Sequence, residues 1–140
     1  MRRVYTDTVV DHVLNPRNAV GMAPGGSASG ADGYGLVTTP EGDSIRMWLR
    51  VRDDRVVEAS FWTDSCAATV ASVSVITELA RRKTVVEALG IGQQDVLDAL
   101  GGLPEGNVHC SLLAVSALRE AVRDYLAVRK EPWKRGYRRY

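Results

Sequence analysis

The stretch Ser44–Arg52, SIRMWLRVR, alternates apolar and polar side chains along its whole length. Its apolar side chains, which fall on one face of an extended chain, are Ile45, Met47, Leu49 and Val51. Because successive side chains of a strand point to opposite faces, this pattern predicts a half-buried antiparallel β-strand. The rest of the chain must then supply a partner strand and a layer that covers the apolar face.

A second extended run follows after two aspartates and places Val57, Ala59 and Phe61 on one face. Matching this face to that of the first strand predicts a hairpin with an odd loop of about three residues at 53–55. Trp48 and Trp62 fall on the opposite face, where we expect a partly exposed aromatic pair. Residues 34–38 are a candidate third strand.

Beyond residue 66 the hydrophobic period changes to that of helices. Spacings of three and four predict an alanine-rich helix with a buried face from Ala67 to residues 81–83 and a long amphipathic helix over 112–126. Shorter helices are expected at 7–14, 85–89 and 93–100, and a loop rich in Gly, Ser and Pro within 16–33. This order predicts an α+β fold: a small antiparallel sheet of about three strands with helices packed on one face.

Composition excludes several classes of protein. The chain has 140 residues, 45% of them hydrophobic, and a net charge of +1, so no overall field attracts nucleic acid or an anionic membrane. Neither a signal peptide nor a membrane-spanning run is present, so we expect a cytoplasmic protein. Its two cysteines are too few for a disulfide-stapled secreted domain, and both are expected to be free thiols or metal ligands.

Cys66 and Cys110 both stand where loop or strand gives way to helix. The positive end of a helix dipole and its unpaired backbone N–H groups favour the thiolate, which is the form that binds metals or attacks electrophiles. A single buried cysteine is more often just a small hydrophobic side chain. Position alone therefore makes each cysteine a candidate ligand or nucleophile.

Three further residues add ligand chemistry. His109 directly precedes Cys110, and Glu41 and Asp43 stand in a tight turn before the first long strand, where a solvated turn is the simpler interpretation. Asp43, Cys66, His109 and Cys110 together would form a mixed tetrahedral set suited to zinc or to iron in a cluster. The spacing does not choose between the two metals.

Four ordered blocks of sequence resemble the IscU/NifU N-terminal family of iron–sulfur scaffold proteins. They are Tyr5 with Val10–His12, Asn15–Asn18 and Gly21; Gly42-Asp43 before the alternating strand; Phe61–Ala68 with Ala71–Ser74 and Thr77-Glu78; and Val108–Ala114. The resemblance covers roughly residues 5 to 126. It implies the fold of that family, in one domain over residues 1–140 with a basic, aromatic tail at 128–140.

The resemblance also implies a function. Members of the family build a cluster from iron and from sulfur that a cysteine desulfurase delivers, and they pass it to apo-proteins. It implies Asp43, Cys66, His109 and Cys110 as ligands of a [2Fe-2S] cluster or of iron, with zinc in a resting or purified form. No catalytic turnover is expected, so the protein would not be an enzyme.

Two departures from the family pattern stand out. Glu41 occupies the place of the first family cysteine; it can bind iron or zinc through oxygen but cannot accept sulfur as a persulfide. Residues 103–107 lack the proline-rich, lysine-ending segment that a dedicated Hsp70-type chaperone recognises, which puts that interaction in doubt.

Alternative functions follow from these departures. The chain could be a zinc-holding or metal-free member that acts as an adaptor or regulatory binding module. It could also be a thiol enzyme or sulfur-transfer protein with His109 as the base for Cys66 or Cys110. Nucleic acid is not an expected partner, and homo-oligomerisation stays open.

Overall fold

The computed structural model describes residues 5–19 and 31–130, where three strands and a set of helices follow one another. The elements in chain order are α1 (Asp7–Leu14), β1 (Gly33–Thr38), β2 (Ser44–Arg52), β3 (Arg55–Thr63), α2 (Ala67–Ala80), α3 (Val85–Leu89), α4 (Gln93–Leu100), a 3-10 turn at Glu105–Asn107 and α5 (His109–Lys130). The segment 20–30 and residues 131–140, which include most of the predicted tail, lie outside the described residues. Because α5 ends at Lys130, residues 128–130 of that tail are helical.

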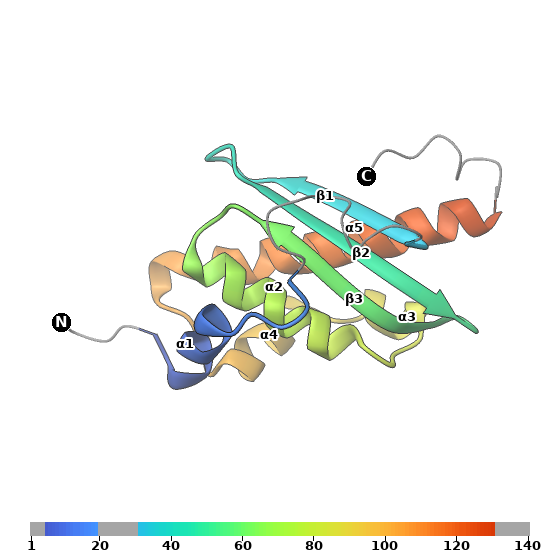
Figure 1. Ribbon diagram of the computed structural model, residues 1–140. Helices are drawn as coiled ribbons and strands as arrows, with labels where there is room; N and C mark the ends of the chain where they lie inside the picture. The colour runs from blue at the N-terminus through green and yellow to red at the C-terminus, as the bar shows by residue number, and fades with distance from the viewer. Residues whose placement is uncertain (1–4, 20–30, 131–140) are drawn as a thin grey trace.

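The sheet has the strand order β1-β2-β3, and both pairings are antiparallel. The helices lie on one face of it: α5 packs against β1 and β2, while α2 packs against β3 (Figure 1). Ile45, Met47 and Leu49 of β2 are fully buried in this shared core. The predicted α+β fold with helices on one face of a three-stranded sheet is confirmed.

The β2–β3 hairpin differs from its predicted form. Arg52 pairs with Arg55, so Asp53 and Asp54 alone make the turn, with φ of 53° and 60° as a two-residue primed turn requires. The pairing then shifts beside Val51, and this β-bulge leaves Val57 43% exposed. The predicted three-residue loop and the inward-facing Val57 were wrong, because the bulge, not the loop, matches the two apolar faces.

On the outer face of the sheet, Trp48 is more deeply buried than predicted. It is 2% exposed and packs with Ala31, Tyr34 and Trp62, and its ring centroid lies 5.8 Å from that of Tyr34. Arg46 lies over Trp62, 5.9 Å from the ring centroid. The expected partial exposure therefore holds for Trp62 but is wrong for Trp48, because residues at and before β1 cover its ring.

Helix α2 is the central helix of the domain. Ten of its fourteen residues are buried, because β3, α1, α4 and α5 all pack against it. The prediction of one buried face underestimated this enclosure. Helix α5 can approach β1 closely because Gly35 has no side chain: a Cβ there would lie 2.6 Å from the Ala117 carbonyl oxygen.

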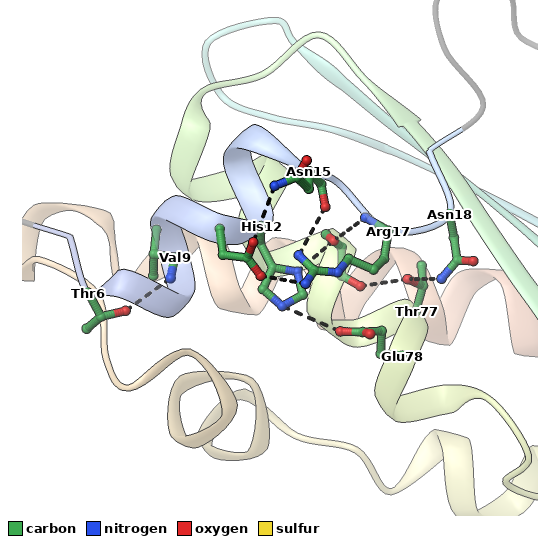
Figure 2. Close-up of polar contacts among 10 residues, drawn as sticks. Thr6, Val9, His12, Asn15, Arg17, Asn18, Thr77 and Glu78 are labelled. Atoms are coloured by element: carbon green, nitrogen blue, oxygen red, sulfur yellow. Dashed lines mark hydrogen bonds and ion pairs between the residues drawn. The ribbon is translucent and has the colours of Figure 1, made fainter.

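Helix α1 is fastened to α2 by buried polar contacts (Figure 2). Thr6 caps α1, since its Oγ1 accepts a hydrogen bond from the Val9 N–H at 3.1 Å. His12 is 4% exposed, and its Nδ1 lies 2.7 Å from the Ser74 hydroxyl, which also accepts from the Arg17 N–H at 2.8 Å. Burial lowers the pKa of His12, so the ring is held neutral.

Candidate metal or cluster site

One cavity gathers all five residues that the sequence singled out. Its volume is about 190 Å³, and its lining residues are Thr39, Glu41, Asp43, Ser65, Cys66, Thr69, Asn107, His109, Cys110 and Leu113. These residues come from the β1–β2 turn, the junction of β3 with α2, and the start of α5. The fold thus brings together three segments that are distant in the sequence.

The carboxylates are presented by a tight turn before β2. Thr39 organises it: its backbone N–H donates to the Asp43 carbonyl at 2.8 Å and its carbonyl accepts from Gly42 at 2.9 Å, while its hydroxyl accepts from the Asp43 N–H at 3.1 Å. Gly42 has a φ of +93°, which a residue without a Cβ adopts at little cost. Glu41 and Asp43 consequently stand on either side of this glycine at the rim of the cavity.

Cys66 is the N-cap residue of α2 and is exposed. Partial burial opposes its thiolate, but hydrogen bonds with Thr69, Cys110 and the Ala68 backbone together outweigh that effect and lower the pKa of the Cys66 thiol. The Thr69 hydroxyl oxygen lies 3.5 Å from the sulfur. Cys66 is therefore the more accessible and more easily ionised of the two thiols.

Cys110 lies in the first turn of α5 and is 1% exposed. Burial raises the pKa of its thiol, and the neighbouring Cys66 acts in the same direction, although a hydrogen bond with Thr69 opposes both. Its sulfur is 3.9 Å from that of Cys66 and 3.8 Å from Nε2 of His109. His109 and Cys110 are consecutive in the chain, and their potential ligand atoms, Nε2 and Sγ, also lie close together.

These separations suit a shared metal ion. With metal–sulfur bonds of about 2.3 Å and metal–nitrogen bonds of about 2.0 to 2.1 Å, tetrahedral angles put two thiolates about 3.8 Å apart and a thiolate and an imidazole about 3.6 Å apart. Within the described part of the chain, no three His, Cys, Asp or Glu side chains already converge as a complete ligand set. The Cys66–Cys110 and Cys110–His109 separations each match a pair of ligands on one ion, but a third ligand must move inward before an ion is held.

Sequence reasoning missed Thr69, which hydrogen-bonds the Cys66 sulfur from inside α2. The available signal was its position three residues after the helix-capping cysteine, where side chains of one helical turn meet.

Among the described residues, no helix has the length and apolar character needed to cross a membrane.

Comparison with known proteins gives a consistent picture. The family model described as "NifU-like N terminal domain" matches residues 4–132. "Iron-sulfur cluster assembly scaffold protein IscU 1" of Archaeoglobus fulgidus is 45% identical over 123 residues, covering 87% of this chain and 76% of that protein. "Iron-sulfur cluster assembly scaffold protein IscU" of Escherichia coli strain K12 is 36% identical over 131 residues, covering 90% and 97%.

Solved structures agree on the fold. The N-terminal part of a NifU-like protein from Brucella abortus superposes with a TM-score of 0.63 at 19% identity, covering 89% of this chain and 95% of that chain. A putative SUF-system scaffold protein from Fervidobacterium islandicum gives a TM-score of 0.61, also at 19% identity, covering 85% and 96%.

Proposed function

Because the chain belongs to the family of NifU-like N-terminal domains, we propose that it is a scaffold on which an iron–sulfur cluster is assembled. Relatives that bear the name of iron–sulfur cluster assembly scaffold, at 36% to 45% identity, support this proposal. The observation that carries it is the cavity of about 190 Å³ in which Asp43, Cys66, His109 and Cys110 meet from separate segments. Thiolate, imidazole and carboxylate groups around one cavity are the donor types that bind zinc and iron.

In this proposal each side chain has a defined function toward the cargo, which is a labile [2Fe-2S] cluster or its iron. Cys66 and Cys110 bind iron as thiolates, His109 binds through Nε2, and Asp43 binds through a carboxylate oxygen. Glu41 is a further oxygen ligand at the rim. Because carboxylate oxygens are harder ligands than thiolates and bind sulfide-bridged iron less firmly, such a cluster is easily released. Easy release suits transfer to acceptor proteins.

Sulfur delivery follows from the same chemistry. Glu41 cannot carry a persulfide, so sulfur from a cysteine desulfurase is received by one of the two thiols. Cys66 is the better acceptor, because it is exposed and its pKa is lowered, whereas Cys110 is buried and its pKa is raised. The chain holds and hands over cargo and has no turnover of its own. A reducing compartment such as the cytoplasm keeps both thiols free.

The direct test is reconstitution under anaerobic conditions with ferrous iron, cysteine, a cysteine desulfurase and a thiol reductant, which supplies the electrons that turn persulfide sulfur into sulfide. Iron, zinc and acid-labile sulfide are then measured per chain in the wild type and in the Cys66→Ser and Cys110→Ser variants. We expect iron and sulfide in near-equal amounts in the wild type and loss of both in each variant. Ser65→Ala is the matched control, since Ser65 lines the cavity without being a proposed ligand. If the cysteine variants held as much iron and sulfide per chain as the wild type, the ligand assignment would be refuted.

The Glu41→Cys variant tests the departure from the family pattern. It adds a third thiolate at the cavity rim, so we expect the reconstituted cluster to survive a chelator for longer than in the wild type. The Glu41→Gln variant removes the carboxylate without adding sulfur and is the control. Equal rates of cluster loss in Glu41→Cys and Glu41→Gln would show that position 41 does not contact the cargo.

A second candidate function is a zinc-holding adaptor or regulatory module. Two observations favour it: Glu41 stands where the family has a cysteine, and the Cys110 sulfur lies at a ligand–ligand separation for a tetrahedral ion from both the Cys66 sulfur and Nε2 of His109. Zinc that resists exchange for iron, together with the absence of acid-labile sulfide after reconstitution, would favour this function over the scaffold.

A further inference from the structure

A second cavity lies at the opposite end of α2, beside the residues that follow α1. Its volume is about 330 Å³, and it is lined by Arg17, Asn18, Glu78, Arg81 and Arg82. None of these residues lines the cavity that contains Cys66 and Cys110, called the thiol cavity below. Because α2 has fourteen residues, the two cavities are about 20 Å apart along the helix. The second cavity is therefore separate from the proposed cluster site.

Among the described residues, two of its three arginines have no counter-ion. Arg17 is neutralised, since its Nη2 lies 2.5 Å from Oδ2 of Asp11 and its Nη1 donates to the Asn15 carbonyl (Figure 2). Arg81 and Arg82 are exposed, and over residues 5–19 and 31–130 neither forms an ion pair. Two uncompensated guanidinium groups thus stand next to each other at one end of the domain.

The backbone of Arg82 is strained. Its φ is +73°, a left-handed conformation that the Cβ of an L-residue disfavours and that glycine adopts freely. Strand β3 imposes it: the Arg82 N–H donates to the Val56 carbonyl at 2.7 Å, and Arg55 Nη1 donates to the Arg82 carbonyl at 2.9 Å. Arg82 directly follows the C-cap of α2, where helices commonly end in this conformation, and the chain carries an arginine there although glycine would fit without strain.

The surroundings decide which anion fits. The side chain of Glu78 lies in the wall, 3.4 Å from Nε2 of His12, and the carboxyl end of α2 adds partial negative charge. Both disfavour a small, highly charged anion enclosed in the cavity. Outside it, the exposed Arg55 and Lys83 extend the positive surface of Arg81 and Arg82. This surface suits separate carboxylates that approach from solvent.

We propose that Arg81 and Arg82 form a docking site for an acidic segment of a partner protein. The Asp or Glu carboxylates of that segment pair with the two guanidinium groups, whose planar donor forks match carboxylate oxygens. Arg55 and Lys83 add attraction at longer range. Because the whole chain has a net charge of only +1, this attraction is local to one end of the domain.

The test uses the full chain and a fluorescein-labelled peptide of ten glutamates, with binding followed by fluorescence anisotropy. We expect salt-dependent binding to the wild type and a dissociation constant at least about fivefold higher for the double variant Arg81→Gln, Arg82→Gly. Glycine at position 82 suits the left-handed backbone, so this variant should fold. In the wild type, the Nε–H signals of Arg81 and Arg82 in ¹⁵N-edited NMR spectra should shift on addition of the peptide.

The matched control is the double variant Arg50→Gln, Arg123→Gln, which removes the same charge from a partly buried and an exposed position, each paired with a glutamate. We expect its dissociation constant to stay within about twofold of the wild-type value. An equal loss in both double variants, or no binding to the wild type, would overturn the proposal. So would displacement of the peptide by equimolar inorganic phosphate, or tighter binding of an oligothymidylate through the same arginines. Unchanged zinc binding by the docking variant would separate this result from the proposed scaffold function.

Discussion

Helix α2 begins beside two thiols, an imidazole and two carboxylates, and it ends beside two arginines that form no ion pair within the described part of the chain. Each end matches the helix dipole, because a thiolate is stabilised at the positive amino end and cations at the negative carboxyl end. Charge at a helix end is therefore no evidence of function on its own. A further observation is needed at each end: three converging segments at Cys66, and a left-handed backbone at Arg82.

The largest expected effect concerns the amino end. Replacing Cys66 or Cys110 by serine removes a thiolate ligand, so we expect the affinity for zinc to fall more than about 100-fold, which is beyond the loss typical of outer-shell partners. Competition with a chromophoric chelator measures this affinity. The Arg81→Gln, Arg82→Gly variant should bind zinc as the wild type does. A similar loss there would show that the two ends are not independent.

A smaller effect is expected where α1 holds the carboxyl half of α2. His12→Gln disturbs the buried contacts with Ser74 and Glu78, and we expect the free energy of unfolding in urea to fall by about 2 kcal/mol. His109→Gln is the control, because His109 is exposed. If both variants lost equal stability, α1 would contribute nothing specific to this half of the helix.

His12 also predicts a pH dependence. Burial lowers its pKa in the folded state below the ordinary value of 6.5, so in acid the unfolded chain takes up a proton that the folded chain resists. The stability from the neutral ring is complete above pH 6.5 and is lost as the pH falls through the folded pKa. Urea unfolding at successive pH values should show this slope in the wild type and a weaker one in His12→Gln. If the slope of the unfolding free energy against pH were the same in His12→Gln as in the wild type, the loss of stability in acid would come from other groups.

The strain at Arg82 predicts a gain in stability. Arg82→Gly relieves the left-handed backbone, and we expect the free energy of unfolding to rise by about 0.5 to 1 kcal/mol. Arg82→Ala removes the same charge but keeps a Cβ, so its stability should stay close to that of the wild type. Thermal unfolding of the three proteins measures the difference. Equal melting temperatures for the glycine and alanine variants would mean that the left-handed backbone at position 82 does not destabilise the fold.

The smallest effect is at the Cys66 thiol. Thr69→Val deletes the hydroxyl within reach of the sulfur, which raises the pKa of Cys66 and should slow its alkylation by iodoacetamide about twofold near pH 8. Thr77→Val makes the same change toward the other end of α2 and should leave the rate unaltered. Mass spectrometry of the Cys66 peptide follows each rate. Equal rates in all three proteins would mean that Thr69 does not tune the thiol.

Much of the fold could be predicted because its elements have clear local periods. The alternation in Ser44–Arg52 and the helical spacings reproduce β2, α2 and α5 closely. The bulge that exposes Val57 could not be predicted, since a two-residue turn with a bulge and a three-residue loop satisfy the same alternation. The burial of Trp48 was missed because its covering residues belong to another segment.

Local pattern placed each cysteine at a helix start, and ligand chemistry suggested Asp43, Cys66, His109 and Cys110 as one set, which the family resemblance also implied. The numbers of residues between Asp43, Cys66 and Cys110 do not predict that their three segments lie side by side in the fold. The conformation of Arg82 had no signal at all, because left-handed backbone is expected at glycine. Their functions as ligands and as a docking site stay predictions.

The enclosure of α2 has a consequence for hydrogen exchange. With ten of its fourteen residues buried, its amides should exchange only when the whole domain opens. The turn that carries Glu41 and Asp43 is largely solvent-exposed and belongs to the part that opens at low free energy. The thiol cavity thus has one wall that is as durable as the fold and another that opens locally, and cargo would enter and leave past the carboxylates.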